Sequence, residues 1–127
     1  MDANVNSINW FEISVADLDR AKNFYETIFG FTMEKMEMPE MPMAMFPSNP
    51  GNGKANGALV QSEMHTPSAD GVKLYLNGDP DLQPVLDKVT DAGGQIIMPK
   101  TDIGQDFGFM AFFIDSEGNV IGLHSNG

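Results

Sequence analysis

The sequence predicts an α+β fold in which a β-α-β-β-β unit occurs twice along 127 residues. Three observations lead to this prediction: an amphipathic helical stretch in each half, strands with period-two alternation around it, and the same element order in both halves. We expect residues 1–127 to be a single domain, with a first module at about 5–64 and a second at about 71–126. Because neither module can close a core alone, the two must share a sheet or clasp each other.

The first module opens with an alternating strand at 7–15. One face of this strand is entirely apolar and is expected to pack against a helix. The opposite face contains Trp10 and Glu12. These two side chains should therefore point away from the core.

A helix is expected at 16–30, with Asp17 as its N-cap and Gly30 as the residue that ends it. Its apolar residues recur at the spacing of one helix face: Leu18, Ala21, Phe24, Tyr25, Ile28 and Phe29. A second helix is expected at 79–94, with Asp79 as the cap and the regular part starting near Pro84. The remaining strands are expected at 31–38, 43–46, 58–64, 72–77, 95–99, 107–115 and 119–124.

Charge and composition narrow the function classes. The net charge of −11 makes nucleic acid and anionic membrane surfaces improbable partners and would attract a cationic ligand. The absence of cysteine excludes disulfides, thiolate catalysis and cysteine-based zinc sites. No signal peptide pattern or long apolar segment is visible, so we expect a cytoplasmic protein.

Methionine is abundant between residues 33 and 45. One interpretation is packing in the core and in a hairpin. The other is an adaptable apolar wall over a ligand cleft, assisted by Phe46, Phe107 and Phe109.

Three segments, "FEISVADLDRAKNFYETIFGF", "GDPDLQPVLDKVTDAGGQIIMPK" and "FFIDSEGNVIGL", carry a family resemblance. They resemble the vicinal oxygen chelate superfamily, which includes glyoxalase I, extradiol dioxygenases and bleomycin resistance proteins, and are most similar to its single-domain glyoxalase-related members. The resemblance implies a curved eight-stranded mixed sheet around a cleft, and homodimers are common in the superfamily.

Enzymes of this superfamily typically bind a divalent metal through four strands. The resemblance places the first, third and fourth ligand positions at Trp10, Lys73 and Gly122, none of which can coordinate a metal. The second position falls within 58–63, at Gln61, Glu63 or Val60. We therefore expect no metal at the usual site and no cofactor. A displaced divalent metal held by Glu12 and His124 remains the alternative.

If the ligand positions face the cleft, the lining side chains are Trp10, Glu12, Lys73, Tyr75 and His124. A polar cleft in which Glu12 pairs with Lys73 is one expectation. Another is that Glu12 has a raised pKa and acts as a metal-free general base. His65 is assigned to the linker between the modules. No G-x-S-x-G motif is present, so a serine triad is not expected.

These residues favour a protein that binds a small molecule, in particular a cationic one, as the bleomycin resistance branch does. The alternative is a lyase, isomerase or dioxygenase that uses the displaced metal or Glu12. A third possibility is a subunit with only an interactive role, pairing through a sheet edge.

Overall fold

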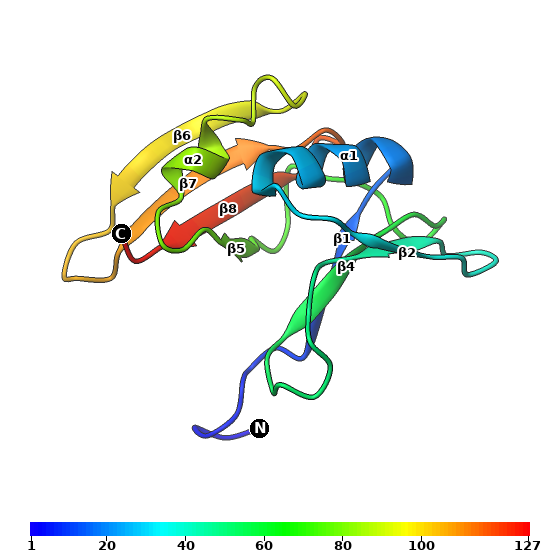
Figure 1. The fold of residues 1–127 in the computed structure, drawn as a ribbon, viewed down its shortest axis with the longest axis horizontal. Helices are drawn as coiled ribbons and strands as arrows, with labels where there is room; N and C mark the ends of the chain where they lie inside the picture. Colours follow the sequence, from blue (N-terminus) through cyan, green and yellow to red (C-terminus); the bar gives the residue numbers. More distant parts are fainter.

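The computed structural model describes residues 1–127 as ten elements in the expected order (Figure 1). The first module contains β1 (Trp10–Ser14), α1 (Leu18–Phe29), β2 (Glu34–Met36), β3 (Met43–Met45) and β4 (Asn56–Val60). The second contains β5 (Tyr75–Asn77), α2 (Gln83–Leu86), β6 (Gln95–Asp102), β7 (Phe109–Ile114) and β8 (Val120–Ser125).

Each module forms its own four-stranded mixed sheet, in the orders β1-β4-β3-β2 and β5-β8-β7-β6. In both sheets the first strand lies parallel to the last, and the other pairs are antiparallel. The repeated β-α-β-β-β architecture is therefore confirmed. One detail differs, because the strands form two sheets rather than one continuous eight-stranded sheet. The modules are joined by a common core and by side-chain hydrogen bonds instead.

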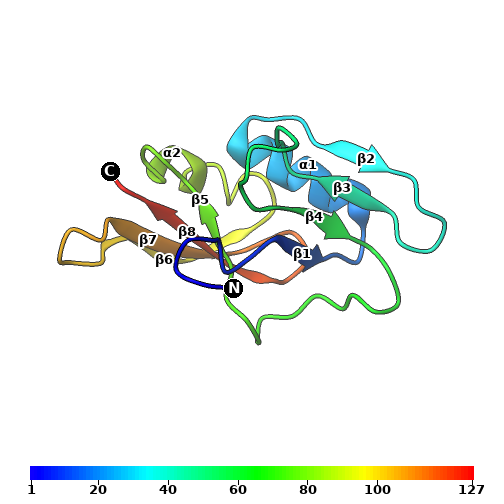
Figure 2. The same cartoon turned by 90° about the horizontal axis from the view of Figure 1, so that it is seen from below.

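The two modules share one apolar core. Both helices lie on the same side of the sheets, and Figures 1 and 2 show α1 and α2 next to each other. Side chains from both halves meet beneath them: Ile13, Phe24, Tyr25, Ile28, Leu82, Leu86, Phe113 and Leu123. The expected core face of β1 is confirmed at Ile13, which is buried, while Trp10 and Glu12 are exposed.

The expected limits of α1 are confirmed by its caps. The Asp17 carboxylate accepts a 3.1 Å hydrogen bond from the Arg20 backbone N–H. Gly30 has a φ of 71°, a left-handed conformation that costs glycine little, and its N–H donates to the Glu26 carbonyl.

The helix expected at 79–94 is much shorter, and Asp79 is not its cap. Regular helix is limited to Gln83–Leu86, although the chain continues in turns that bury Val89. The Asp79 carboxylate instead accepts hydrogen bonds from the backbone and side-chain N–H groups of Asn126. Because Asp79 holds the C-terminal end of the chain, it is not free to cap the helix.

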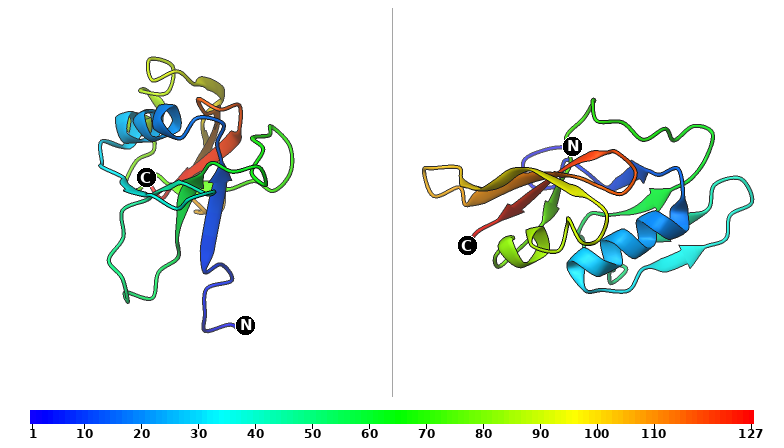
Figure 3. Two further views of the ribbon diagram at one scale, coloured as in Figure 1. Left: turned by 90° about the vertical axis from the view of Figure 1, so that its right-hand side faces the viewer. Right: turned by 90° about the horizontal axis from the view of Figure 1, so that it is seen from above.

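The segment after β4 also differs from its expected strand. β4 ends at Val60, and the Gln61 side chain accepts a 2.8 Å hydrogen bond from the Leu18 N–H at the start of α1. The Gln61 side chain is thereby bound to a residue 43 positions earlier in the chain. Figure 3 shows the N-terminal segment and the loop before β4 projecting from the same end of the first sheet, where Asn6 donates to the Gly53 carbonyl.

The turn before β8 fastens the modules together. The buried Tyr25 hydroxyl donates a 2.7 Å hydrogen bond to Asp115, and the Asn119 amide donates to the Ser14 carbonyl. Glu117 in the same turn accepts two hydrogen bonds from the Arg20 guanidinium.

No helix of the structure has the length and apolar character needed to cross a lipid bilayer.

Candidate ligand groove and its polar residues

Glu12 lies on the face of β1 that points away from the helices. Its Oε1 atom is 2.8 Å from Nε2 of His65, and its Oε2 atom accepts a 3.2 Å hydrogen bond from the Trp10 indole. The alternation of β1 explains why Trp10 and Glu12 share this face. The structure therefore brings Trp10, Glu12 and His65 into one hydrogen-bonded group.

His65 lies in the linker, as predicted, but its contact with Glu12 is not predicted by the sequence. A tight turn after β4 carries it, and its Nδ1 atom is 2.6 Å from the Ser62 hydroxyl oxygen. One feature could have indicated this contact. Because β4 is the parallel neighbour of β1, the linker that leaves β4 starts beside the end of β1. The position of the ring still depends on the turn geometry, which the local sequence does not reveal.

The pKa of Glu12 is lowered from its usual value, chiefly by the hydrogen bond from His65 and against an opposing effect of partial burial. The Trp10 indole lowers it further. The expectation of a raised pKa is therefore wrong. Glu12 is an ionised carboxylate at neutral pH and a weak base.

A groove of about 170 Å³ runs beside Glu12, between β1, the linker and the start of β8. Its polar lining consists of Glu12, Ser14, Thr66, Ser68, Asp70 and Asn119. Two carboxylates and no cationic side chain line this groove, so its electrostatics favour a cation.

Lys73 does not pair with Glu12, which corrects the expected ion pair. The Lys73 ammonium donates to the Ala69 carbonyl at 2.9 Å, within its own loop. The Glu12 carboxylate is already engaged by His65 and Trp10. The two residues therefore contribute separately to the surface.

Tyr75 and Gly122 are direct neighbours in the parallel β5–β8 pair. A Cβ atom added to Gly122 would lie 2.7 Å from a ring carbon of Tyr75, which is far inside contact distance. The Tyr75 ring also packs against Phe112, with ring centroids 5.4 Å apart. An aromatic ring therefore covers Gly122, the position that the family resemblance assigns to a ligating carboxylate.

His124 faces the other end of the second sheet. Its Nε2 atom is 2.7 Å from the Phe107 carbonyl oxygen, in the loop before β7. No hydrogen bond connects His124 with Glu12, Lys73 or Tyr75. The five cleft residues expected from the sequence thus fall into separate local groups.

The residues at the positions that the resemblance assigns to metal ligands do not fit a divalent metal. Trp10, Lys73 and Gly122 offer no suitable donor, and Gln61 is occupied by α1. Glu63 lines an open pocket beside Met41 and Met64, and no cluster of three or more His, Asp or Glu side chains is arranged to hold an ion.

The methionines divide between two environments. Met33 belongs to the main core, whereas Met43 packs with Ala58 and Val60 on the opposite face of the first sheet, together with Met41 and Met45. Phe46 does not join this wall as expected, because its side chain lies in the main core. Phe107 is exposed in its loop, and Phe109 lies beneath the Lys100 ammonium.

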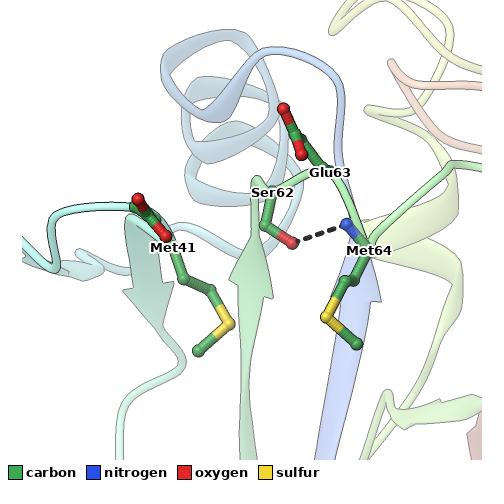
Figure 4. Close-up of a pocket in the computed structure, with 5 residues that line it drawn as sticks. Met41, Ser62, Glu63 and Met64 are labelled. Atoms are coloured by element: carbon green, nitrogen blue, oxygen red, sulfur yellow. Dashed lines mark hydrogen bonds between the residues drawn. The ribbon is translucent and has the colours of Figure 1, made fainter.

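Beside this wall lies a pocket of about 610 Å³, lined by Glu40, Met41, Ser62, Glu63 and Met64. Figure 4 shows the side chains of Met41 and Met64 extending on either side of Ser62. The Glu63 carboxylate points away from the two thioethers. The pocket therefore combines two flexible apolar side chains with one hydroxyl group and two carboxylates.

Comparison with known proteins agrees with this fold. Residues 7–123 match the family model described as Glyoxalase/Bleomycin resistance protein/Dioxygenase superfamily, and the chain belongs to this superfamily. It is 33% identical to "Putative glyoxylase CFP32" of Mycobacterium tuberculosis over 119 residues, which are 91% of this chain and 44% of that protein. The chain thus spans less than half the length of this relative.

Two further similarities support the same assignment. A "Glyoxylase-like domain-containing protein" of Didymella fabae is 30% identical over 116 residues, which are 89% of this chain and 88% of that protein. Among solved structures, a mutant of glyoxalase I from Zea mays aligns with a TM-score of 0.68 and 20% identity over 93% of this chain and 46% of that one. The structural similarity at this identity concerns the fold alone.

Proposed function

We propose that the protein binds a small organic cation in the groove beside Glu12 and needs no metal to do so. One observation carries the proposal: the ionised Glu12 carboxylate lies next to the Trp10 indole, whose residue is 41% exposed. A carboxylate and an aromatic face together attract an ammonium group through charge and cation–π interaction. The net charge of −11 adds long-range attraction.

Lys73, Tyr75 and His124, which were expected to line the same cleft, enter this proposal only as separate surface contacts, because no hydrogen bond joins them to Glu12. Tyr75 is 46% exposed and presents a second aromatic ring. The Lys73 ammonium donates one hydrogen bond to the Ala69 carbonyl and keeps further N–H donors for a neutral or anionic part of the ligand.

Calorimetric titration with benzyltrimethylammonium tests the proposal, with uncharged benzyl alcohol as the matched ligand. We expect the cation to bind at least about tenfold more tightly than the alcohol. Glu12→Gln and Trp10→Leu should each abolish that preference. Asp91→Asn, which removes an equal charge from an exposed site in the second module, should leave it unchanged. Equal binding by wild type and Glu12→Gln would refute the proposal.

Metal analysis of protein purified without chelators provides an independent check. We expect no stoichiometric Zn, Fe, Ni or Mn. A bound metal that is lost in both Glu12→Ala and His124→Ala would instead support the displaced metal site and an enzymatic function.

We further propose that two chains associate in a cytoplasmic homodimer. The relative CFP32 is more than twice as long as the matched region, and exposed side chains such as Met64 and Val72 flank the groove region. Sedimentation equilibrium should give twice the monomer mass. A monomer at micromolar concentration would contradict this assembly.

A further inference from the structure

We propose that Ser62, His65 and Glu12 form a relay that makes Ser62 a nucleophile for acyl transfer from an uncharged or cationic ester. The Ser62 hydroxyl oxygen is 2.6 Å from Nδ1 of His65, and Nε2 of His65 is 2.8 Å from Glu12 Oε1. Nucleophile, base and carboxylate in hydrogen-bonded sequence are the arrangement that activates serine on many unrelated folds.

The proton positions follow from the charges. Glu12 is ionised and can only accept, so the Nε2 atom of His65 carries the hydrogen. This tautomer leaves the lone pair of Nδ1 free to accept the Ser62 proton. Glu12 is thus a positioning residue, because it acts on the serine only through the imidazole.

Two backbone N–H groups beside Ser62 favour the reaction, one by contacting the serine oxygen and one by remaining free to contact the substrate. The Met64 N–H donates to the Ser62 hydroxyl oxygen at 3.1 Å, which stabilises negative charge as the proton leaves (Figure 4). The N–H of Glu63, the residue after the serine, makes no hydrogen bond within the protein. It can therefore donate to an oxyanion formed on a bound carbonyl group.

The turn between Ser62 and His65 replaces the serine motif that the sequence lacks. The two residues form an isolated β-bridge, with the His65 N–H donating to the Ser62 carbonyl at 3.1 Å. This bridge sets hydroxyl and imidazole side by side three residues apart. Glu12 lies on β1 and is 53 residues from His65 in the sequence.

The surroundings of Ser62 define the substrate class. Ser62 lines both the pocket of about 610 Å³ and a neighbouring one of about 440 Å³ that also contains His65. Met41 and Met64 provide an adaptable wall for an apolar acyl group. Glu40 and Glu63 repel carboxylate and phosphate esters, so an uncharged or cationic ester fits best.

The reaction balances with an ester and water alone. The Ser62 oxygen bonds to the carbonyl carbon while its proton passes to His65 Nδ1. The bond to the alcohol oxygen then breaks, and the same proton goes to that oxygen. Water repeats these steps on the acyl-serine, releasing the carboxylic acid and restoring the Ser62 hydroxyl.

A fluorophosphonate probe, read by intact-mass and peptide mass spectrometry, tests the nucleophile. We expect one adduct, located on Ser62, with Ser62→Ala unlabelled and the exposed-serine control Ser48→Ala labelled like the wild type. His65→Gln should slow labelling by about 100-fold, since a general base contributes at least that much. An adduct at another serine, or none after prolonged exposure, would overturn the proposal.

Glu12→Gln separates positioning from simple support of the turn. A glutamine amide can donate to Nε2 and so favour the tautomer that cannot accept the serine proton. We expect labelling to slow by about 100-fold while the melting temperature stays near that of the wild type. Labelling at the wild-type rate would contradict the role assigned to Glu12.

Ser62→Cys keeps the test decisive if His65→Gln is unstable, because it introduces the only thiol in the chain. The pH dependence of iodoacetamide alkylation gives the pKa of that thiol. We expect a lower thiol pKa in Ser62→Cys than in Ser48→Cys, an exposed control position outside the turn that carries His65. Equal pKa values would refute base assistance. Binding of benzyltrimethylammonium should survive Ser62→Ala, so the two proposals can fail separately.

Discussion

Glu117 and Arg20 form a two-pronged ion pair across the modules, with N–O distances of 2.7 and 2.9 Å. The Glu117 carboxylate also accepts the backbone N–H groups of Ala16 and Asp17. With the Ser116 hydroxyl, five donors surround a side chain that has no exposed surface. The pair connects the last turn of the chain to the first turn of α1.

We expect Glu117→Gln to lower the free energy of unfolding by about 2 kcal/mol, because the ionic hydrogen bonds are weakened while the shape is kept. Chemical denaturation measures this difference. Glu34→Gln, which changes an exposed carboxylate on β2, is the matched control and should have little effect. A loss no larger than that of the control would contradict the importance of the pair.

The same carboxylate predicts sensitivity to acid. Its pKa falls from 4.5 to about 2 because hydrogen bonds from Arg20 and from the backbone and Ser116 outweigh the opposing effect of burial. The folded state binds the proton more weakly than the unfolded state, so this stabilisation is complete above pH 4.5 and is lost as the pH falls towards 2. Denaturation between these pH values should show a shallower decline for Glu117→Gln than for the wild type. Parallel profiles would be inconsistent with this assignment.

Tyr25→Phe removes the hydroxyl that donates to Asp115 in the core. We expect a loss of about 1–3 kcal/mol in unfolding free energy, because a buried carboxylate oxygen loses a donor. Tyr75→Phe is the matched control, since Tyr75 is partly exposed and its hydroxyl makes no hydrogen bond within the protein. Similar losses for the two variants would argue against a specific role for the buried bond.

Gly122→Ala should destabilise the protein by about 1–3 kcal/mol, because the new methyl group meets the Tyr75 ring at 2.7 Å. Because of this clash, the effects of substitutions at Gly122 and Tyr75 on the unfolding free energy should not be additive. Adding Gly122→Ala to a Tyr75→Ala background should cost much less, which a double-mutant cycle measures. Additive effects would show that the ring does not determine the requirement for glycine.

Local signals allowed parts of the fold to be predicted from sequence. The α1 helix carries its N-cap, its apolar period and its terminating glycine within one short segment, and its limits were correct. The second helix failed because Asp79, a plausible cap by itself, is used by Asn126 from the far end of the chain. Propensity cannot detect such competition for one side chain.

The candidate site was less predictable because its partners are distant in sequence. The alternation of β1 correctly placed Trp10 and Glu12 on one exposed face. The bond between Glu12 and His65 depends on where the linker crosses β1, so the expected partner Lys73 was wrong. The cover over Gly122 likewise depends on the register of β5 with β8.

The turn from Asp115 to Asn119 has a consequence for the history of the chain. A protein of two similar halves is readily explained by duplication of a shorter gene whose product paired with itself. Here Asn119 donates to the Ser14 carbonyl of the first half and accepts the Ser68 N–H of the linker. The corresponding turn of the first half, near residues 50–54, makes no such bonds to the second. A copy of the first half in the second position would therefore lack the Asn119 bonds that hold the second half against Ser14 and the linker.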